Sequence, residues 1–281
     1  MLTTITPYWD RIDTLRVLLK ALNGAGVLGV RHLFMCVGPP TRELIQLRDE
    51  QDPRFIEFLF VGGVPGDLSI GHYHNIGASM CNSEWIMKLD VDTIPHVSFF
   101  HHLLALLDTA GDRDWYNVGM FYALQDISEL LLSLGEMPLK EEIYHRIVSG
   151  KKHTFQLPFP AGSNFVCRRE SYIALGGSLP GFRGYGWEDY QQLYMLEEHR
   201  LQGNPLPGVV SLVNVTQRCR DELSRKKAAE LLSKDPALAL LHRWHSVSTN
   251  TRYRNTLRSQ ENRTILLEYI LAHRARRTFL V

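Results

Sequence analysis

The stretch Trp85-Ile86-Met87-Lys88-Leu89-Asp90-Val91-Asp92 is an apolar strand pattern that ends in two acids. In open α/β sheets ligands bind beyond the carboxyl ends of the strands, so these acids mark an expected ligand site. Side chains alternate along a strand, which places Lys88, Asp90 and Asp92 on one face. Two carboxylates on one side favour a hard divalent cation, Mg²⁺ or Mn²⁺. Two solvated aspartates in an ordinary turn would give the same motif.

Short apolar runs alternate with helical patterns on both sides of this stretch, which predicts an α/β fold with a mostly parallel sheet flanked by helices. Strands are expected over residues 2–6, 32–37, 55–61, 84–90, 115–124, 162–167 and 208–215. Helices are expected to end near Gly24, to pass through Asn75 and Met80, and to cover 96–107, 169–175, 188–200 and 221–241.

Composition gives an ordinary globular protein, with 44% hydrophobic and 22% charged residues and a net charge of +1 over 281 residues. The charge is unevenly placed, because residues 251–281 hold seven arginines and two glutamates, a net +5. We therefore divide the chain into a domain over 1–250 and a basic, helical C-terminal extension over 251–281. The extension is either a solvated helix or a surface for phosphates, nucleic acid included.

The four cysteines are scattered and form no CxxC pair, which argues against structural zinc and a disulfide framework. No apolar run approaches the roughly 18 residues of a membrane span. The first residues are too short and too polar a stretch for a signal peptide. We expect a cytoplasmic protein with reduced thiols and no membrane span.

A second motif is Gly181-Phe182-Arg183-Gly184-Tyr185-Gly186-Trp187-Glu188-Asp189-Tyr190. Its glycines permit a tight loop, and its acids open the helix expected from residue 188. Acids at a helix start are also favoured by capping and by the helix dipole, which is the plain structural interpretation. An aromatic ring beside two carboxylates would suit a sugar, and one acid could act as a general base.

A third motif is Leu241-His242-Arg243-Trp244-His245-Ser246. On a helix, histidines three residues apart lie on one side and within reach of one metal ion. Twelve histidines are scattered through the chain, so the spacing alone is unspecific.

Taken in order, the motifs resemble the catalytic domain of inverting GT-A glycosyltransferases. The family includes the β-1,4-galactosyltransferases, chondroitin-polymerase-type domains and polypeptide N-acetylgalactosaminyltransferases. The resemblance covers roughly residues 2–250. It rests on Thr6-Pro7-Tyr8-Trp9-Asp10-Arg11, Asn75-Ile76-Gly77, Asp90-Val91-Asp92-Thr93-Ile94-Pro95, Gly162, Arg168-Arg169-Glu170, Gly176-Gly177, Gly186-Trp187-Glu188-Asp189 and His245-Ser246.

The resemblance implies a nucleotide-sugar donor, a UDP-sugar by analogy, bound with Mn²⁺ or Mg²⁺. The metal ligands would be Asp92 and His245, supported by Asp90 and His242. The donor would also contact Thr6, Pro7, Tyr8, Arg11, Asn75, Lys88 and Asp90. On the acceptor side, Asp189 would be the general base, and Trp187 and Glu188 would bind the acceptor.

Two departures from the family pattern leave alternatives open. Many relatives carry an acid at the end of the second strand, where this chain has Cys36-Val37-Gly38-Pro39-Pro40, so the base of the nucleotide is not fixed. Trp187 directly precedes Glu188, without the glycines that often separate them. A saccharide is the leading acceptor, with a lipid-linked sugar, a protein or modified DNA as alternatives. The competing functions are a sugar-phosphate nucleotidyltransferase and a non-catalytic carbohydrate- or nucleic-acid-binding protein.

Overall fold

The computed structural model of the chain describes residues 1–64, 67–123, 125, 128–129, 155–159, 164–184, 186–201, 217–235, 237–243 and 256–278. The strands are β1 Leu2–Tyr8, β2 Val30–Val37, β3 Ile56–Val61, β4 Trp85–Lys88, β5 Thr93–Pro95, β6 Trp115–Asn117, β7 Met120–Ala123, β8 Phe155–Phe159, β9 Phe165–Arg168 and β10 Leu240–His242. The helices include α1 Ile12–Gly24, α2 Arg42–Asp49, α3 Ile70–Met80, α4 Phe99–Leu107, α7 Arg169–Ala174, α8 Glu188–Arg200, α9 Gln217–Lys234 and α10 Thr256–Thr278.

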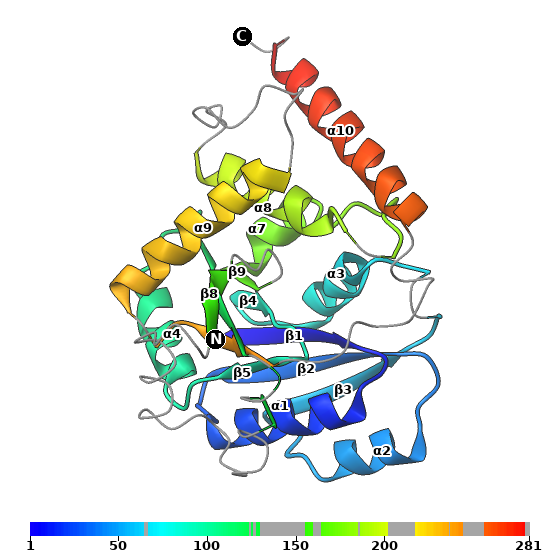
Figure 1. Cartoon of the computed structure of the whole chain (residues 1–281), viewed down its shortest axis with the longest axis vertical. Coiled ribbons are helices and arrows are strands. Elements are labelled where there is room, and N and C mark those ends of the chain that lie inside the picture. Colours follow the sequence, from blue (N-terminus) through cyan, green and yellow to red (C-terminus); the bar gives the residue numbers. More distant parts are fainter. Residues whose placement is uncertain are drawn as a thin grey trace.

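The main sheet, within the described part of the chain, has six strands in the order β3-β2-β1-β4-β9-β6. The neighbours β3, β2, β1 and β4 run parallel to one another. Strands β9 and β6 are antiparallel to their neighbours at the other edge. Helices cover both faces of this sheet (Figure 1), so the predicted α/β fold with a mostly parallel sheet is confirmed.

The two faces of the sheet are buried by different helices. Helices α1, α2 and α4 pack with one hydrophobic cluster, which contains Trp85 and Met87 of β4. Helices α3, α7 and α8 pack with the other, which contains Ile86. Because side chains alternate along a strand, Lys88 follows Ile86 onto the side of α8. This alternation determines what the buried end of β4 contacts.

Residues 115–124, expected to be one strand, form two strands in different sheets. Strand β6 belongs to the main sheet, whereas β7 belongs to a four-stranded sheet of described residues in the order β5-β10-β7-β8. The chain crosses between the sheets at Gly119, whose carbonyl accepts from the Leu240 amide at 3.0 Å. A Cβ on Gly119 would lie 3.4 Å from the Ala228 Cβ of α9, so the helix packs closely on this crossing.

The helix expected over residues 221–241 is also corrected. Helix α9 ends at Lys234, and the apolar run after it forms β10. Asp235 stops the helix with a turn, in which its Oδ1 accepts from the Ala237 amide at 2.8 Å. His242 therefore lies on a strand and not on the helical turn expected for it. The strand expected over 208–215 lies outside the described residues.

Two further properties of the described residues concern membrane-spanning helices and cysteines. No helix in the described ranges is long and apolar enough to cross a membrane. Cys36, Cys81 and Cys167 are buried and free. Burial raises the pKa of the Cys36 thiol to about 12. Burial also raises the pKa of the Cys167 thiol, so the thiols of Cys36 and Cys167 are held in the protonated form.

Candidate active site

The turn after β4 carries the first acid pair, held by backbone hydrogen bonds. Strand β4 ends at Lys88, so Asp90 and Asp92 lie in a turn, and the alternation expected for them on a strand does not apply. The Asp90 amide donates to Oδ1 of the fully buried Asn164 at 3.0 Å. The Thr93 hydroxyl donates to the Asp90 carbonyl at 2.6 Å. The position of the turn is thus fixed from both sides.

Asp92 meets two basic side chains from distant segments. Arg11 Nη1 lies 3.2 Å from Asp92 Oδ2, and His242 Nε2 lies 3.5 Å from Asp92 Oδ1. Strand pairing positions the histidine, because β10 runs antiparallel to β5 and the Arg243 amide donates to the Asp92 carbonyl at 2.8 Å. The His242 ring stacks on Tyr122 with centroids 4.3 Å apart.

The chemistry of this donor set fits a divalent metal. A carboxylate oxygen and an imidazole nitrogen 3.5 Å apart are both ligands that Mn²⁺ accepts. No group of three or more His, Cys, Asp or Glu side chains that could hold a metal ion exists among the residues placed by the structure. Mg²⁺ and related ions commonly use few protein ligands and take others from substrate phosphates. His245 lies outside the described residues.

Of the residues expected to hold the nucleotide, Thr6, Pro7, Tyr8 and Arg11 lie at the end of β1 or just after it, next to β4 in the sheet. Strand β1 extends through Pro7 to Tyr8, past the residues Leu2–Ile5 that pair with β4. Proline has no N–H to donate, and position 7 has no partner on β4, so a proline is tolerated there. Thr6 is buried, and its Oγ1 has no hydrogen-bond partner within the described part of the chain. Arg11 has a left-handed backbone, with φ 66°, where α1 begins.

Asn75 has a clear structural role. Its Oδ1 accepts from the Tyr172 hydroxyl and from the Ser178 amide, both at 2.8 Å. Its Nδ2 donates to the Ser178 carbonyl at 2.8 Å. A Cβ on Gly177 would lie 2.3 Å from Asn75 Oδ1, so only glycine fits there. Asn75 thus joins α3 to the loop after α7, and its contact with a nucleotide stays a prediction.

The second acid pair opens α8, as expected, but its members differ in environment. Glu188 is only 2% exposed, and its Oε2 has no hydrogen-bond partner in the described ranges. Burial, followed by repulsion from Asp189, raises the pKa of Glu188 to about 8. The Asp189 side chain is 23% exposed and forms an ion pair with Lys88. Burial therefore favours the protonated form of Glu188, next to the ion pair of Asp189 with Lys88.

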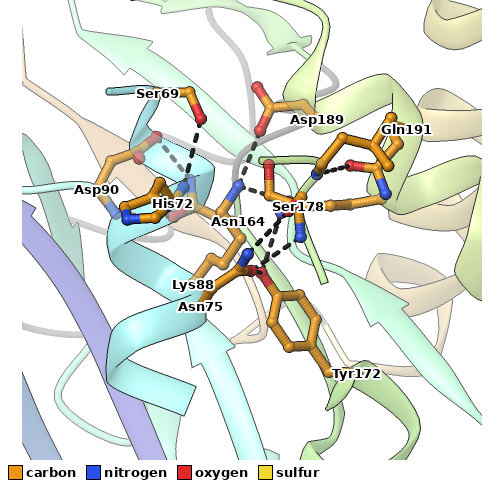
Figure 2. A network of polar contacts seen from close by, with 12 residues as sticks. Ser69, His72, Asn75, Lys88, Asp90, Asn164, Tyr172, Ser178, Asp189 and Gln191 are labelled. Atoms are coloured by element: carbon orange, nitrogen blue, oxygen red, sulfur yellow. Dashed lines mark hydrogen bonds and ion pairs between the residues drawn. The ribbon is translucent and has the colours of Figure 1, made fainter. Parts of the chain in front are cut away.

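One hydrogen bond connects the segment that carries the first acid pair to the second acid pair. Lys88 Nζ donates to Asp189 Oδ1 at 2.8 Å, although the two residues are 101 positions apart. Figure 2 shows Asp189 and Lys88 with Asn164 and Asp90 beside them. The turn that bears Asp90 and the start of α8 therefore both lie at the end of β4.

Trp187 is held by its neighbours on α8 and α10. Its ring stacks on Tyr190 with centroids 5.0 Å apart, and its Nε1 donates to the Ser259 hydroxyl at 3.1 Å. The Arg263 guanidinium lies 5.7 Å from the ring centroid. The backbone of Trp187 is left-handed, with φ 76°. Its proposed contact with a sugar stays a prediction.

Helix α10 packs on this side of the molecule. Leu266 and Ile270 are buried in a cluster with residues of α8. Asn262, 1% exposed, accepts from the Arg183 amide at 3.0 Å and donates to the Arg183 and Gly186 carbonyls at 2.8 and 3.0 Å. The helix therefore braces the glycine-rich loop. Arg252, Arg254 and the side chains of Arg274, Arg276 and Arg277 lie outside the described residues; Arg258 is described.

Comparison with solved structures finds similar folds at low identity. GalNAc-T7, solved with UDP, GalNAc and Mn²⁺, is 14% identical over 70% of this chain and 40% of its own, with a TM-score of 0.46. Glucosyl-3-phosphoglycerate synthase from Mycobacterium tuberculosis is 17% identical over 83% and 79%, with a TM-score of 0.43. Drosophila β-1,4-galactosyltransferase 7 is 12% identical over 70% and 61%, with a TM-score of 0.36. The chain thus spans less than half of the GalNAc-T7 chain.

Comparison with sequence families gives a direct assignment. The sequence model of glycosyltransferase-like family 2 matches residues 66–220, more than half of the chain. The match includes both acid pairs, Asp90–Asp92 and Glu188–Asp189. No curated protein matches the sequence significantly. The chain belongs to glycosyltransferase-like family 2.

Proposed function

We propose that this member of glycosyltransferase-like family 2 is a metal-dependent inverting enzyme, which transfers a sugar from a nucleotide-sugar to a hydroxyl group of a saccharide. The observation that carries the proposal is the Lys88–Asp189 ion pair at 2.8 Å. It puts a partly exposed carboxylate next to the turn that bears Asp90 and Asp92. A base on one side and an acidic turn on the other are what an in-line displacement requires.

In the proposed reaction Asp189 accepts the proton of the acceptor hydroxyl. The oxygen forms a bond to the anomeric carbon as the bond from that carbon to the diphosphate breaks. The electron pair of the broken bond leaves with the nucleoside diphosphate, and the configuration at the anomeric carbon inverts. Burial favours the protonated form of Glu188, which does not compete with Asp189 for the proton.

On the donor side Asp92 and His242 would hold the metal, with Asp90 in support and His245 as a further candidate. A bound divalent cation neutralises the charge that develops on the diphosphate. Arg11, 3.2 Å from Asp92, contributes a positive charge of the chain's own at this turn. The nucleotide would lie against Thr6, Pro7, Tyr8 and Asn75.

UDP-sugars are the donors to test first, and the acceptor side is formed by Trp187 with Glu188 behind it. We assign residues 1–250 to the catalytic domain and 251–281 to a helical extension. The extension braces the glycine-rich loop before α8, on the acceptor side. The contacts of Asn262 and Ser259 support this use of the extension. A saccharide is the proposed acceptor, with lipid-linked sugars and proteins next in order.

A donor-hydrolysis screen tests the proposal without knowledge of the acceptor. The protein is incubated with UDP-, GDP- and dTDP-sugars, with Mn²⁺ or with a chelator, and release of the nucleoside diphosphate is measured. We expect slow, Mn²⁺-dependent release from one donor class, which Asp92→Ala abolishes. No release from any donor, together with pyrophosphate release from a nucleoside triphosphate and a sugar phosphate, would instead establish a nucleotidyltransferase.

A further inference from the structure

Lys88 is a buried cation at the end of β4. Its side chain is 1% exposed, and its Nζ donates to Asp189 Oδ1 at 2.8 Å and to Gln192 Oε1 at 2.9 Å. The ammonium also lies 5.2 Å from the centroid of the Phe165 ring. Burial of a lysine charge is strongly unfavourable unless its partners are fixed. An apolar residue would suit this strand position for packing alone, so the lysine requires another explanation.

The partners of Lys88 are fixed by a chain of hydrogen bonds. Gln192 Nε2 donates to the Tyr172 hydroxyl at 3.1 Å, and this hydroxyl donates to Asn75 Oδ1 at 2.8 Å. Asn75 in turn binds the Ser178 backbone, as Figure 2 shows. This series of hydrogen bonds connects α8, α7 and α3 next to the Lys88 ammonium. The bonds of Asn75 to the Ser178 backbone anchor this series of hydrogen bonds at one end, and the Asp189 carboxylate lies at the other end.

We propose that Lys88 is a positioning residue, which holds Asp189 Oδ1 so that Oδ2 faces the hydroxyl of the acceptor. This inference rests on the proposed function, because it assumes that Asp189 is the base. A base must stay within about 3 Å of the proton that it accepts, and a shift of about 1 Å costs roughly 100-fold in rate. The bond from Lys88 Nζ holds one oxygen of the Asp189 carboxylate and so restricts its rotation.

The same bond connects the two halves of the site. Lys88 lies two residues before Asp90 on the same segment, so one side chain connects the end of β4 to Asp189. Lys88, expected from the sequence to contact the nucleotide-sugar, thus acts on the acceptor side in this proposal.

Lys88→Met tests the proposal, because methionine fills the space without the charge. We expect kcat for transfer to fall roughly 100-fold, while the donor KM and the UDP affinity stay within about twofold of wild type. Gln192→Leu, which removes the second acceptor of Nζ, is expected to lower kcat less, and Tyr172→Phe least. An unchanged kcat in folded Lys88→Met overturns the inference.

Lys227→Met is the matched control. Lys227 is also a largely buried lysine, 11% exposed, with its Nζ 5.4 Å from the Trp115 ring centroid and 3.5 Å from Glu197. Its loss removes a comparable charge away from the acid pairs, and we expect kcat to remain that of wild type. An equal loss of kcat in both lysine variants would overturn the positioning role, because general destabilisation would then account for it.

A double-mutant cycle separates this inference from the proposed function. If Lys88 acts through Asp189, Lys88→Met has little further effect on kcat once Asp189→Asn is present. If Lys88→Met lowers kcat in the Asp189→Asn background as much as in the wild-type background, the positioning role is overturned and the proposed function is unaffected. A near-wild-type Asp189→Asn enzyme overturns the proposed base instead. If Lys88→Met does not fold, Gln192→Leu in the two backgrounds gives the same cycle.

Discussion

The two acid pairs of this molecule are similar in sequence and opposite in setting. Asp90 and Asp92 lie in a turn whose backbone is fixed, and basic groups of other segments approach Asp92 from two sides. Glu188 and Asp189 begin a helix, where one acid is buried and the other is held by a buried lysine. The first setting brings carboxylates and basic groups together, as a metal-bound diphosphate requires. The second places a buried acid next to an acid that a buried lysine holds, as the proposed proton transfer requires.

Asp189→Asn should produce the largest effect, and it addresses the second pair. The amide keeps the shape but accepts no proton, so turnover should fall by roughly 100-fold or more. Donor binding should survive, because the first pair is intact. Steady-state transfer assays with calorimetry on UDP and Mn²⁺ measure both quantities. A simultaneous loss of donor affinity would show that the two pairs do not have separate tasks.

Asp92→Ala should give the converse result. The loss of a carboxylate ligand is expected to weaken Mn²⁺-dependent UDP binding by more than roughly tenfold. The same calorimetry measures it, and Asp13→Ala on the exposed surface of α1 serves as a control for loss of an acid. Unchanged UDP affinity in Asp92→Ala would show that Asp92 has only a structural role. The two acid pairs would then not have separate functions.

His242→Phe sharpens the description of the first pair. Phenylalanine preserves the stack on Tyr122 and removes the nitrogen 3.5 Å from Asp92. We expect the Mn²⁺ concentration for half-maximal donor hydrolysis to rise by roughly tenfold. Wild-type metal dependence would exclude His242 as a ligand, and His245→Ala would then be measured in the same assay.

Glu188→Gln has the smallest predicted effect, on stability and its pH dependence. The pKa of Glu188 rises from 4.5 to about 8 on folding, so the folded state binds more protons than the unfolded state between these values. Stability from this group is therefore present below about pH 4.5 and is lost as pH rises through about 8. The glutamine variant should gain Tm relative to wild type from pH 5 to pH 8. A difference in Tm that is independent of pH would contradict the burial of an ionisable acid.

The first strands and helices could be predicted because local patterns determine them. Leu15, Leu18 and Leu22 mark α1, and α8 begins and ends where its acids and Arg200 indicate. Helix α2 was missed, although Thr41 caps it by accepting from the Leu44 amide at 3.2 Å. That signal was present in the sequence. Strand β10 cannot be told from helix in the sequence because its apolar run is short and its pairing with β5 and β7 is long-range.

The site could be predicted as a set of residues but not as a set of contacts. The acid pairs stand out as short motifs, whereas the Lys88–Asp189 bond joins positions 101 residues apart. Asn164, Gln192 and Asn262 were not identified at all. Each is a single buried polar residue inside an otherwise ordinary segment, and its importance depends on the partner that folding brings to it.

Arg11 and Trp187 are the non-glycine residues with positive φ in the described part of the chain, at 66° and 76°. Each immediately precedes the helix beside one acid pair. A left-handed backbone costs a side-chain-bearing residue roughly 1–2 kcal/mol, and glycine removes that cost while it adds about 1 kcal/mol of unfolded-state entropy. The two backbone terms nearly cancel, so the side chains decide the outcome. Glycine at position 187 would remove the stack on Tyr190 and the bond to Ser259, and glycine at position 11 would remove the ion pair with Asp92. Selection for heat resistance alone would therefore retain the tryptophan and the arginine, even before turnover is selected.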